Sequence, residues 1–227
     1  MARTSYPKAA EPLPAPLPPE TRTVGQLVAE SIRLYGQRFW AALALGILPA
    51  ALTLLAAQLP RTARLVVTPT VGAAVLSVSF VGASCIVLGQ RPPLRMLAVP
   101  FGAGLVAFVP VPFLVFLFVL PALAWLAFVG LAVPAAIAEQ LGLRAALVRG
   151  MTLARVDFVH ALGSLATLAI VAFLTQSVLF FLLRGTGKAT LWTASFLADL
   201  VIAPLVFLGF ALLYVDQAAR SAAGPSV

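Results

Sequence analysis

The chain contains no asparagine and only one cysteine, one histidine and seven acidic residues. Without asparagine it has no acceptor for N-glycosylation. The single cysteine, Cys85, cannot form a disulfide within the chain or a thiolate metal site, and we interpret it as a small packing residue. The single histidine, His160, excludes any site that needs two imidazoles. Ser164 lies four residues after His160, but nothing in the sequence orients the imidazole or forms a nucleophile elbow. The sequence therefore predicts no catalytic residues, no cofactor and no metal site.

Charged residues are also scarce, at 10% of the chain, whereas 62% of the residues are hydrophobic and the mean hydropathy is +1.06. A soluble domain is closer to about half apolar and about a quarter charged. Because a folded chain still exposes much of its surface, this apolar excess cannot all be hidden in one core. We therefore predict an all-α, polytopic transmembrane bundle that is surrounded by a lipid bilayer.

The formal net charge of +8 would suggest a nucleic-acid partner if the domain were soluble. Here the fifteen Lys and Arg residues are scattered between apolar runs, which is typical of the loops that orient membrane proteins. We therefore predict no nucleic-acid partner.

The apolar runs divide the chain into a tail, one membrane domain and a short end. Residues 1–21 contain six prolines and are predicted to be a disordered tail. Residues 22–220 form the membrane domain, and residues 221–227 are predicted to be a flexible C-terminal tail. Six spans are predicted within the domain, at about 40–59, 65–89, 95–110, 112–138, 161–183 and 191–215.

Spans three and four come from one stretch, Val99–Ala138, whose forty residues include no charged residue and no Ser, Thr, Asn or Gln. A single helix of this length would extend about 60 Å, against a hydrocarbon core of about 30 Å. The stretch must therefore fold back once. Proline disfavours helix at the residue before it, so we predict the turn at residues 109–112, Val-Pro-Val-Pro.

Two further helices are too polar to span and are predicted to lie in the membrane interface. The first begins at Thr23, which has capping-box spacing to Gln26, and leads into span one at Trp40. The second lies between spans four and five, in residues 139–160. Its basic face is formed by Arg144, Arg149 and Arg155. This face has two interpretations: attraction of anionic lipids, worth about 1 kcal/mol per basic residue, or recognition of a phosphate-bearing lipid or a partner protein.

An even number of spans places both termini on one side of the membrane. Eleven Lys and Arg residues fall on the side of the termini and four, Arg61, Arg64, Arg184 and Lys188, on the other. This excess predicts that both termini are cytoplasmic. Arg outnumbers Lys by thirteen to two, a bias typical of GC-rich bacterial genomes, so we expect a bacterial plasma membrane.

One acidic residue, Asp199, lies inside a span, about 12 Å into span six by the helical rise. Such a group costs about 2.5–3.5 kcal/mol on insertion scales, so it is expected to face the bundle or water. Gln176 in span five should lie at similar depth, because the two spans form a tight hairpin. A hydrogen bond between Gln176 and Asp199 is one interpretation. A carboxylate that handles protons or ions is another, and an Asp close enough to the surface to meet Lys188 or Arg184 is a third.

Three stretches together resemble a family named for the membrane domain of glycerophosphoryl diester phosphodiesterases. They are Thr23–Trp40; Pro134–Glu139 followed by Ala146, Leu147, Arg149 and Leu153; and Tyr214–Asp216 with Arg220. The resemblance covers about residues 22–220, with Gly150 where the family has Ser and Gln217 as a second departure. It implies six helices and a bacterial plasma membrane, but no catalysis. In fused members the hydrolysis belongs to a separate barrel domain with histidines, carboxylates and a divalent metal, and most stand-alone members have no assigned activity.

Two functions are consistent with these observations. The first is a non-enzymatic integral membrane protein that organises partner proteins or anionic lipids. The alternative is a small transporter, or a transporter subunit, in which Asp199 is the coupling carboxylate.

Overall fold

The computed structural model describes residues 18–224, except for the side chain of Lys188, and this part contains helices and no strand. The predicted disordered tail at 1–17 and the last three residues lie outside it. The elements are η1 (Pro19–Thr21), α1 (Val24–Gln37), α2 (Phe39–Gln58), α3 (Arg61–Val67), the π-helical η2 (Thr68–Gly72), α4 (Ala73–Leu88), η3 (Leu94–Met96), α5 (Ala98–Phe108), α6 (Val111–Leu117), α7 (Val119–Val129), α8 (Ala132–Ala138), α9 (Leu143–Val156), α10 (Phe158–Leu182) and α11 (Lys188–Ala223). Residues 19–21, assigned to the tail, thus form a helical turn.

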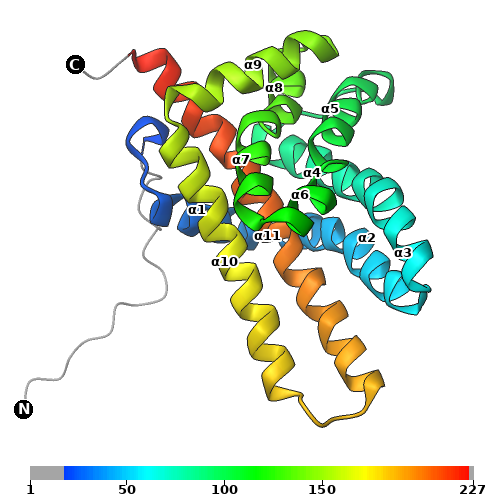
Figure 1. Cartoon of the computed structure of the whole chain (residues 1–227). Helices are drawn as coiled ribbons and strands as arrows, with labels where there is room; N and C mark the ends of the chain where they lie inside the picture. Colours follow the sequence, from blue (N-terminus) through cyan, green and yellow to red (C-terminus); the bar gives the residue numbers. More distant parts are fainter. Residues whose placement is uncertain (1–17, 225–227) are drawn as a thin grey trace, which may run out of the picture.

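Six of the described segments are long and apolar enough to cross a membrane, which confirms the all-α, multi-pass class. They are Phe39–Gln58, Arg61–Leu88, Leu94–Leu117, Val119–Ala138, Phe158–Leu182 and Ala189–Ala223. We call the end of the molecule that holds α9 and the C-terminal end of α11 the near face (Figure 1). The opposite end, with the α2–α3 and α10–α11 turns, is the far face.

Helix α1 begins with the predicted capping box. The Gln26 amide donates to the Thr23 hydroxyl at 3.4 Å, and the Thr23 amide donates to the Gln26 side chain at 2.8 Å. The helix packs across α11 at Gly209, where an added Cβ would lie 3.0 Å from the Ser31 hydroxyl. At Arg38 the backbone leaves the helical region, and the chain turns into α2. Helix α1 therefore crosses the bundle before the first long helix begins.

One helix in this half of the chain begins earlier than predicted. The second span is predicted from about residue 65, but α3 already begins at Arg61. Proline is tolerated just before a helix, since its missing amide has no partner to lose there. The Arg64 side chain then donates to the Leu59 carbonyl at 3.2 Å, which caps the end of α2. The chain runs from α3 to α4 through the π-helical segment that contains Pro69.

The turn between spans three and four lies at Phe118 and not at residues 109–112. Helix α5 continues until the Val109 amide bonds to the Leu105 carbonyl, and the Pro110 carbonyl then accepts from Leu114. The prolines thus occupy the start of α6, where no amide donor is required. At Phe118 the backbone is extended, with φ −167° and ψ 154°, and here the chain reverses into α7.

Helix α11 is the centre of the fold. It has 36 residues and contacts α1, α2, α4 and α10. The sequence ended this helix at residue 215 and the domain at 220, but the helix continues to Ala223. Polar contacts of its last turns, described below, account for the extension.

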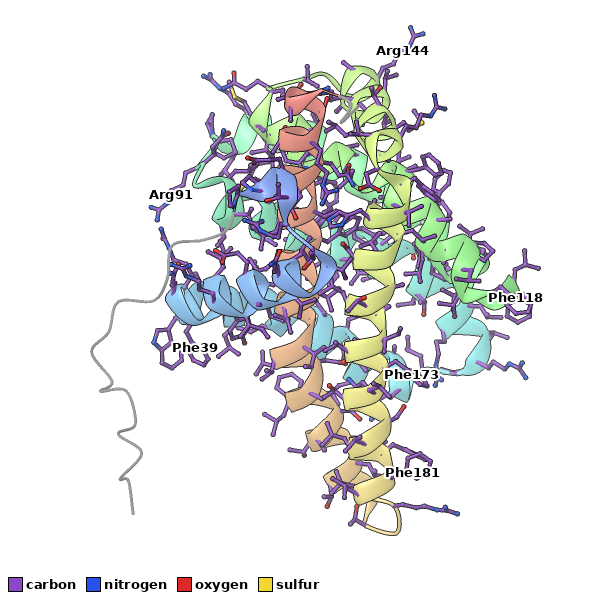
Figure 2. All side chains as sticks on the ribbon, turned by 90° about the vertical axis from the view of Figure 1, so that its left-hand side faces the viewer. Phe39, Arg91, Phe118, Arg144, Phe173 and Phe181 are labelled. Carbon is purple, nitrogen blue, oxygen red and sulfur yellow. The ribbon has the colours of Figure 1, made fainter. Side chains whose placement is uncertain are left out.

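The buried core lies toward the near face. Phe80 of α4 stacks on Phe210 of α11 with ring centroids 4.6 Å apart, and Phe108 meets Phe80 edge-on. Helix α9 lies directly on α8, since a Cβ at Gly150 would come within 2.6 Å of the Ala132 backbone nitrogen. This contact explains why position 150 is occupied by glycine. Toward the far face, α10 is mostly exposed and Phe173 and Phe181 project outward from the bundle (Figure 2).

Candidate functional site

A polar group from three helices lies midway along the far-face half of α11. Gln176 of α10 donates to the Asp199 carboxylate of α11 at 2.5 Å, so the predicted hydrogen bond is present. Thr53 of α2 also lies beside the Asp199 carboxylate. Its hydroxyl donates to the Pro49 carbonyl at 3.1 Å. We call Thr53, Gln176 and Asp199 the mid-span triad.

Chain geometry explains why the mid-span triad forms. The α10–α11 connection is short, so the two helices pack side by side and bring Gln176, six residues before the end of α10, within hydrogen-bonding distance of Asp199, eleven residues after the start of α11. Helix α2 comes close to α11 because Gly46 has no side chain; a Cβ there would collide with the Leu200 carbonyl oxygen. Eleven residues of helix separate Asp199 from Lys188, about 16 Å by the helical rise. An Asp199–Lys188 contact would therefore have to bridge this distance.

The three predicted arginines of α9 do not form one uniform face. Arg149 lies at the edge of the predicted basic face and turns toward Glu139, whose carboxylate accepts from its Nε at 2.8 Å. Tyr214 of α11 donates to the same carboxylate at 3.1 Å. Arg144 and Arg155 are exposed, and neither forms an ion pair with another described residue. Arg149 therefore joins α9 to α11, and only two of the three predicted arginines remain available to a ligand.

Two more arginines, Arg91 and Arg95, belong to the same face. In the sequence they count only among the positive charges that orient the chain in the membrane. Arg91 and Arg95 line a groove of about 610 Å³ between the α4–α5 connection and the residues after α8. Within the described chain neither forms an ion pair. Arg91 and Arg144 both project outward at the near-face end (Figure 2). We call Arg91, Arg95, Arg144 and Arg155 the near-face arginines.

A second polar group, which sequence reasoning did not identify as a site, lies buried beneath this face. Arg22, just before α1, donates to Asp216 of α11 at 2.6 Å, and their side chains are 7% and 0% exposed. Arg220 donates to Asp157 at 2.6 Å and to the Arg22 carbonyl at 2.7 Å. Gln217 donates to the Asp157 carbonyl at 2.9 Å. We call these residues the near-face cluster; their only signal in the sequence was three polar residues, at 216, 217 and 220, closing an apolar helix.

His160 borders the near-face cluster. Its Nε2 lies 3.8 Å from the Asp216 carboxylate and its Nδ1 lies 3.5 Å from Arg220. Among the described residues Nε2 has no hydrogen-bond partner, so the ring is oriented at most by the 3.5 Å contact between Nδ1 and Arg220. The Ser164 hydroxyl is buried and has no hydrogen-bond partner, so it is not joined to the imidazole. The described residues contain no group of three or more His, Cys, Asp or Glu side chains that could hold a metal ion.

Comparison of the chain with protein-family models, with curated proteins and with solved structures finds no match.

Proposed function

We propose that this chain is a non-enzymatic integral membrane protein whose near face binds anionic lipid headgroups and thereby organises lipids or partner proteins. The observation that carries this proposal is the set of four near-face arginines, which have no ion-pair partner among the described residues. The two acidic residues that flank α9 are already paired: Glu139 with Arg149 and Tyr214, and Asp157 with Arg220. The face is therefore left with uncompensated positive charge.

Attraction to an anionic leaflet contributes about 1 kcal/mol per basic residue near the surface, so four such residues would bind several headgroups weakly or one firmly. Phosphate oxygens also match the fork of donors on each guanidinium. Membership in the phosphodiesterase membrane-domain family is part of this proposal and rests on the resemblance of the three stretches.

The proposal is tested by comparing lipid-induced stabilisation. A variant with Arg91, Arg95, Arg144 and Arg155 all changed to Gln should lose the rise in unfolding temperature that phosphatidylglycerol gives over phosphatidylcholine in detergent. The matched control is Arg61→Gln with Arg184→Gln, two exposed arginines of the far face. This control should keep the wild-type response. Equal responses in both variants would mean that the near-face arginines bind no lipid headgroup.

The proposed location is a bacterial plasma membrane with the near face and both termini in the cytoplasm, which the eleven-to-four charge excess supports. In a Cys85→Ser background, Thr186→Cys should react with a membrane-impermeant maleimide added to intact cells, and Ala145→Cys should not. Residue 145 is chosen because it is exposed whereas its neighbour Ala146 is buried. The reverse labelling would invert the orientation.

A small transporter is the second candidate, because a groove is lined by residues next to the mid-span triad in α2 and α11. It has a volume of about 400 Å³ and lies between α2 and α11 on the side of the far face. Leu54 in its lining follows Thr53, and Phe196 is one helical turn from Asp199. If Asp199 couples transport, Asp199→Asn would keep the fold and abolish pH-dependent flux in liposomes. Our proposal predicts that the wild-type protein shows no such flux.

A further inference from the structure

The turn between α6 and α7 carries a continuous run of exposed apolar side chains. All six residues from Val115 to Leu120 are exposed, with Phe116 at 94% and Leu117 and Phe118 at 70%. No charged residue and no Ser, Thr, Asn or Gln occurs between Val99 and Ala138, so the turn also has no polar neighbour in sequence. Fully burying one such side chain contributes about 1.5–3 kcal/mol, so placing this turn in water would be costly.

The depth of the turn follows from its register with α10. Phe128 of α7 stacks on Phe158 at the near-face start of α10, with ring centroids 4.7 Å apart. From Phe128 the chain runs back ten residues to Phe118, about 15 Å by the helical rise. From Phe158, α10 continues twenty-four residues to Leu182, about 36 Å. The turn therefore ends about 20 Å short of the far end of α10.

Two other observations place the turn at the same depth. Helix α6 contacts the π-helical segment Thr68–Gly72, which begins seven residues after the far-face start of α3 at Arg61. In Figure 2, Phe118 lies nearer than Phe173 to the end that holds Arg144, whereas Phe181 lies at the opposite end. The helices of this hairpin are also interrupted, since α5 and α7 have eleven residues each, and α6 and α8 have seven. The arms as wholes, Leu94–Leu117 and Val119–Ala138, are long enough to cross a membrane if straight, so these interruptions and the register with α10 are what limit the depth of the turn.

The turns that do reach the far face differ in composition. The α2–α3 turn is followed by Arg61 and Arg64, and the α10–α11 turn contains Arg184, Gly185 and Thr186. These residues suit water and headgroups, whereas Val115–Leu120 suits acyl chains. Two backbone positions at the turn need no further partner, because the Phe118 amide donates to the Leu114 carbonyl at 2.7 Å and Pro121 has no amide.

The exposed turn is continuous in depth with the lipid-facing side of α10. Large exposed apolar residues of α10 gather from Ile170 onward, and they include Phe173, Leu174, Val178, Phe180, Phe181 and Leu182. By the register above, Phe118 is level with about residue 168 of α10, at the near-face edge of this zone. The surroundings that cover the exposed side of α10 therefore cover the turn as well.

We propose that α5–α8, Ala98–Ala138, form a re-entrant hairpin that enters the membrane from the near face and whose turn contacts the acyl chains of the near leaflet without reaching the far face. The chain then crosses the membrane four times. Four and six are both even, so the two termini stay on one side, as do Arg91, Arg95 and Arg144. The inference is thus independent of the proposed function and of which face is cytoplasmic.

Cysteine accessibility in the full-length protein tests the hairpin. In the Cys85→Ser background, Phe118→Cys is compared with Thr186→Cys at the far face and Ala145→Cys at the near face. A membrane-impermeant maleimide is applied to sealed membrane vesicles of each orientation. Residues 145 and 186 should react from opposite sides, and residue 118 should react from neither side until detergent dissolves the membrane. Reaction of residue 118 from the same side as residue 186 would establish two full crossings and overturn the proposal.

A spin label on the same variants tests the contact with lipid. At residue 118 its relaxation should respond strongly to oxygen and weakly to a water-soluble nickel complex, as at Phe173→Cys and unlike Thr186→Cys. Strong relaxation by the nickel complex would place the turn in water and contradict the lipid contact. Val115→Cys and Leu120→Cys, which are also exposed, provide the same measurement if Phe118→Cys folds poorly.

Discussion

The near-face cluster and the mid-span triad each hold an acidic residue of α11, buried Asp216 and half-buried Asp199, and they stabilise these residues differently. In the near-face cluster each carboxylate meets a guanidinium, and the paired residues are 194 and 63 positions apart in sequence. In the mid-span triad the carboxylate meets an amide and a hydroxyl, both neutral. Charge pairing thus joins distant segments near the membrane surface. Within the span, close helix contact at Gly46 brings the partners together, and the polar contacts are few.

The largest loss of stability is expected when the Arg22–Asp216 ion pair is broken. Asp216→Leu removes the carboxylate beside a guanidinium that is only 7% exposed, and it should lower the free energy of unfolding by about 3–5 kcal/mol. Changing Arg22 and Asp216 together to Leu should recover much of this loss, because no buried charge is then left uncompensated. Unfolding in detergent measures both. If the double variant is no more stable than the single one, the charge is not what stabilises this contact.

A smaller loss of stability is expected from a substitution at Gly46, where α2 crosses α11. In Gly46→Ala the new methyl group would collide with the Leu200 carbonyl, so the helices must separate, at a cost of about 1–3 kcal/mol. The separation should also move Thr53 away from Asp199. Gly36→Ala in α1 is the matched control, because a Cβ there meets nothing within 4 Å, and it should be neutral or slightly stabilising. Equal stability of the two variants would contradict close packing at Gly46.

Asp157 has two roles in the near-face cluster, helix capping and charge pairing, and substitutions at this position can separate them. Its carboxylate accepts from the His160 amide at 2.9 Å, which caps α10, and also pairs with Arg220. Because Asp157 is 35% exposed, the ion pair should contribute little, and Asp157→Ala should cost about 1 kcal/mol, mainly through the lost cap. Asp157→Ser keeps a capping oxygen without the charge. It should therefore recover most of the stability lost in Asp157→Ala.

The smallest loss of stability is expected when the Gln176–Asp199 hydrogen bond is removed. Hydrogen bonds between helices in membranes average about 0.6 kcal/mol, and a double-mutant cycle with Asp199→Leu and Gln176→Leu should give a coupling of this size. Asp199→Asn should preserve most of the stability, since the amide still bonds to Gln176. A coupling as large as that of the Arg22–Asp216 pair would remove the distinction between the two sites.

The sequence predicted those features that depend on neighbouring residues. Hydropathy located six apolar segments, and the spacing of Thr23 and Gln26 predicted the capping box. The Gln176–Asp199 bond was also predictable, because the short loop between α10 and α11 makes the two helices pack side by side. The same reasoning failed at Phe118, where prolines at 110 and 112 suggested a turn but were accommodated at the start of a helix.

Contacts between remote segments were decided only by the tertiary structure. Arg149 was expected to share a basic face with Arg144 and Arg155, but Glu139, brought beside it by the α8–α9 connection, withdraws it from that face. Nothing local to Arg22 indicates Asp216, and nothing in the apolar stretch from Val99 to Ala138 indicates how deep its turn reaches. Periodicity and hydropathy report how each segment meets its surroundings, whereas the partner of a buried charge and the depth of a turn depend on how helices pack across the whole chain.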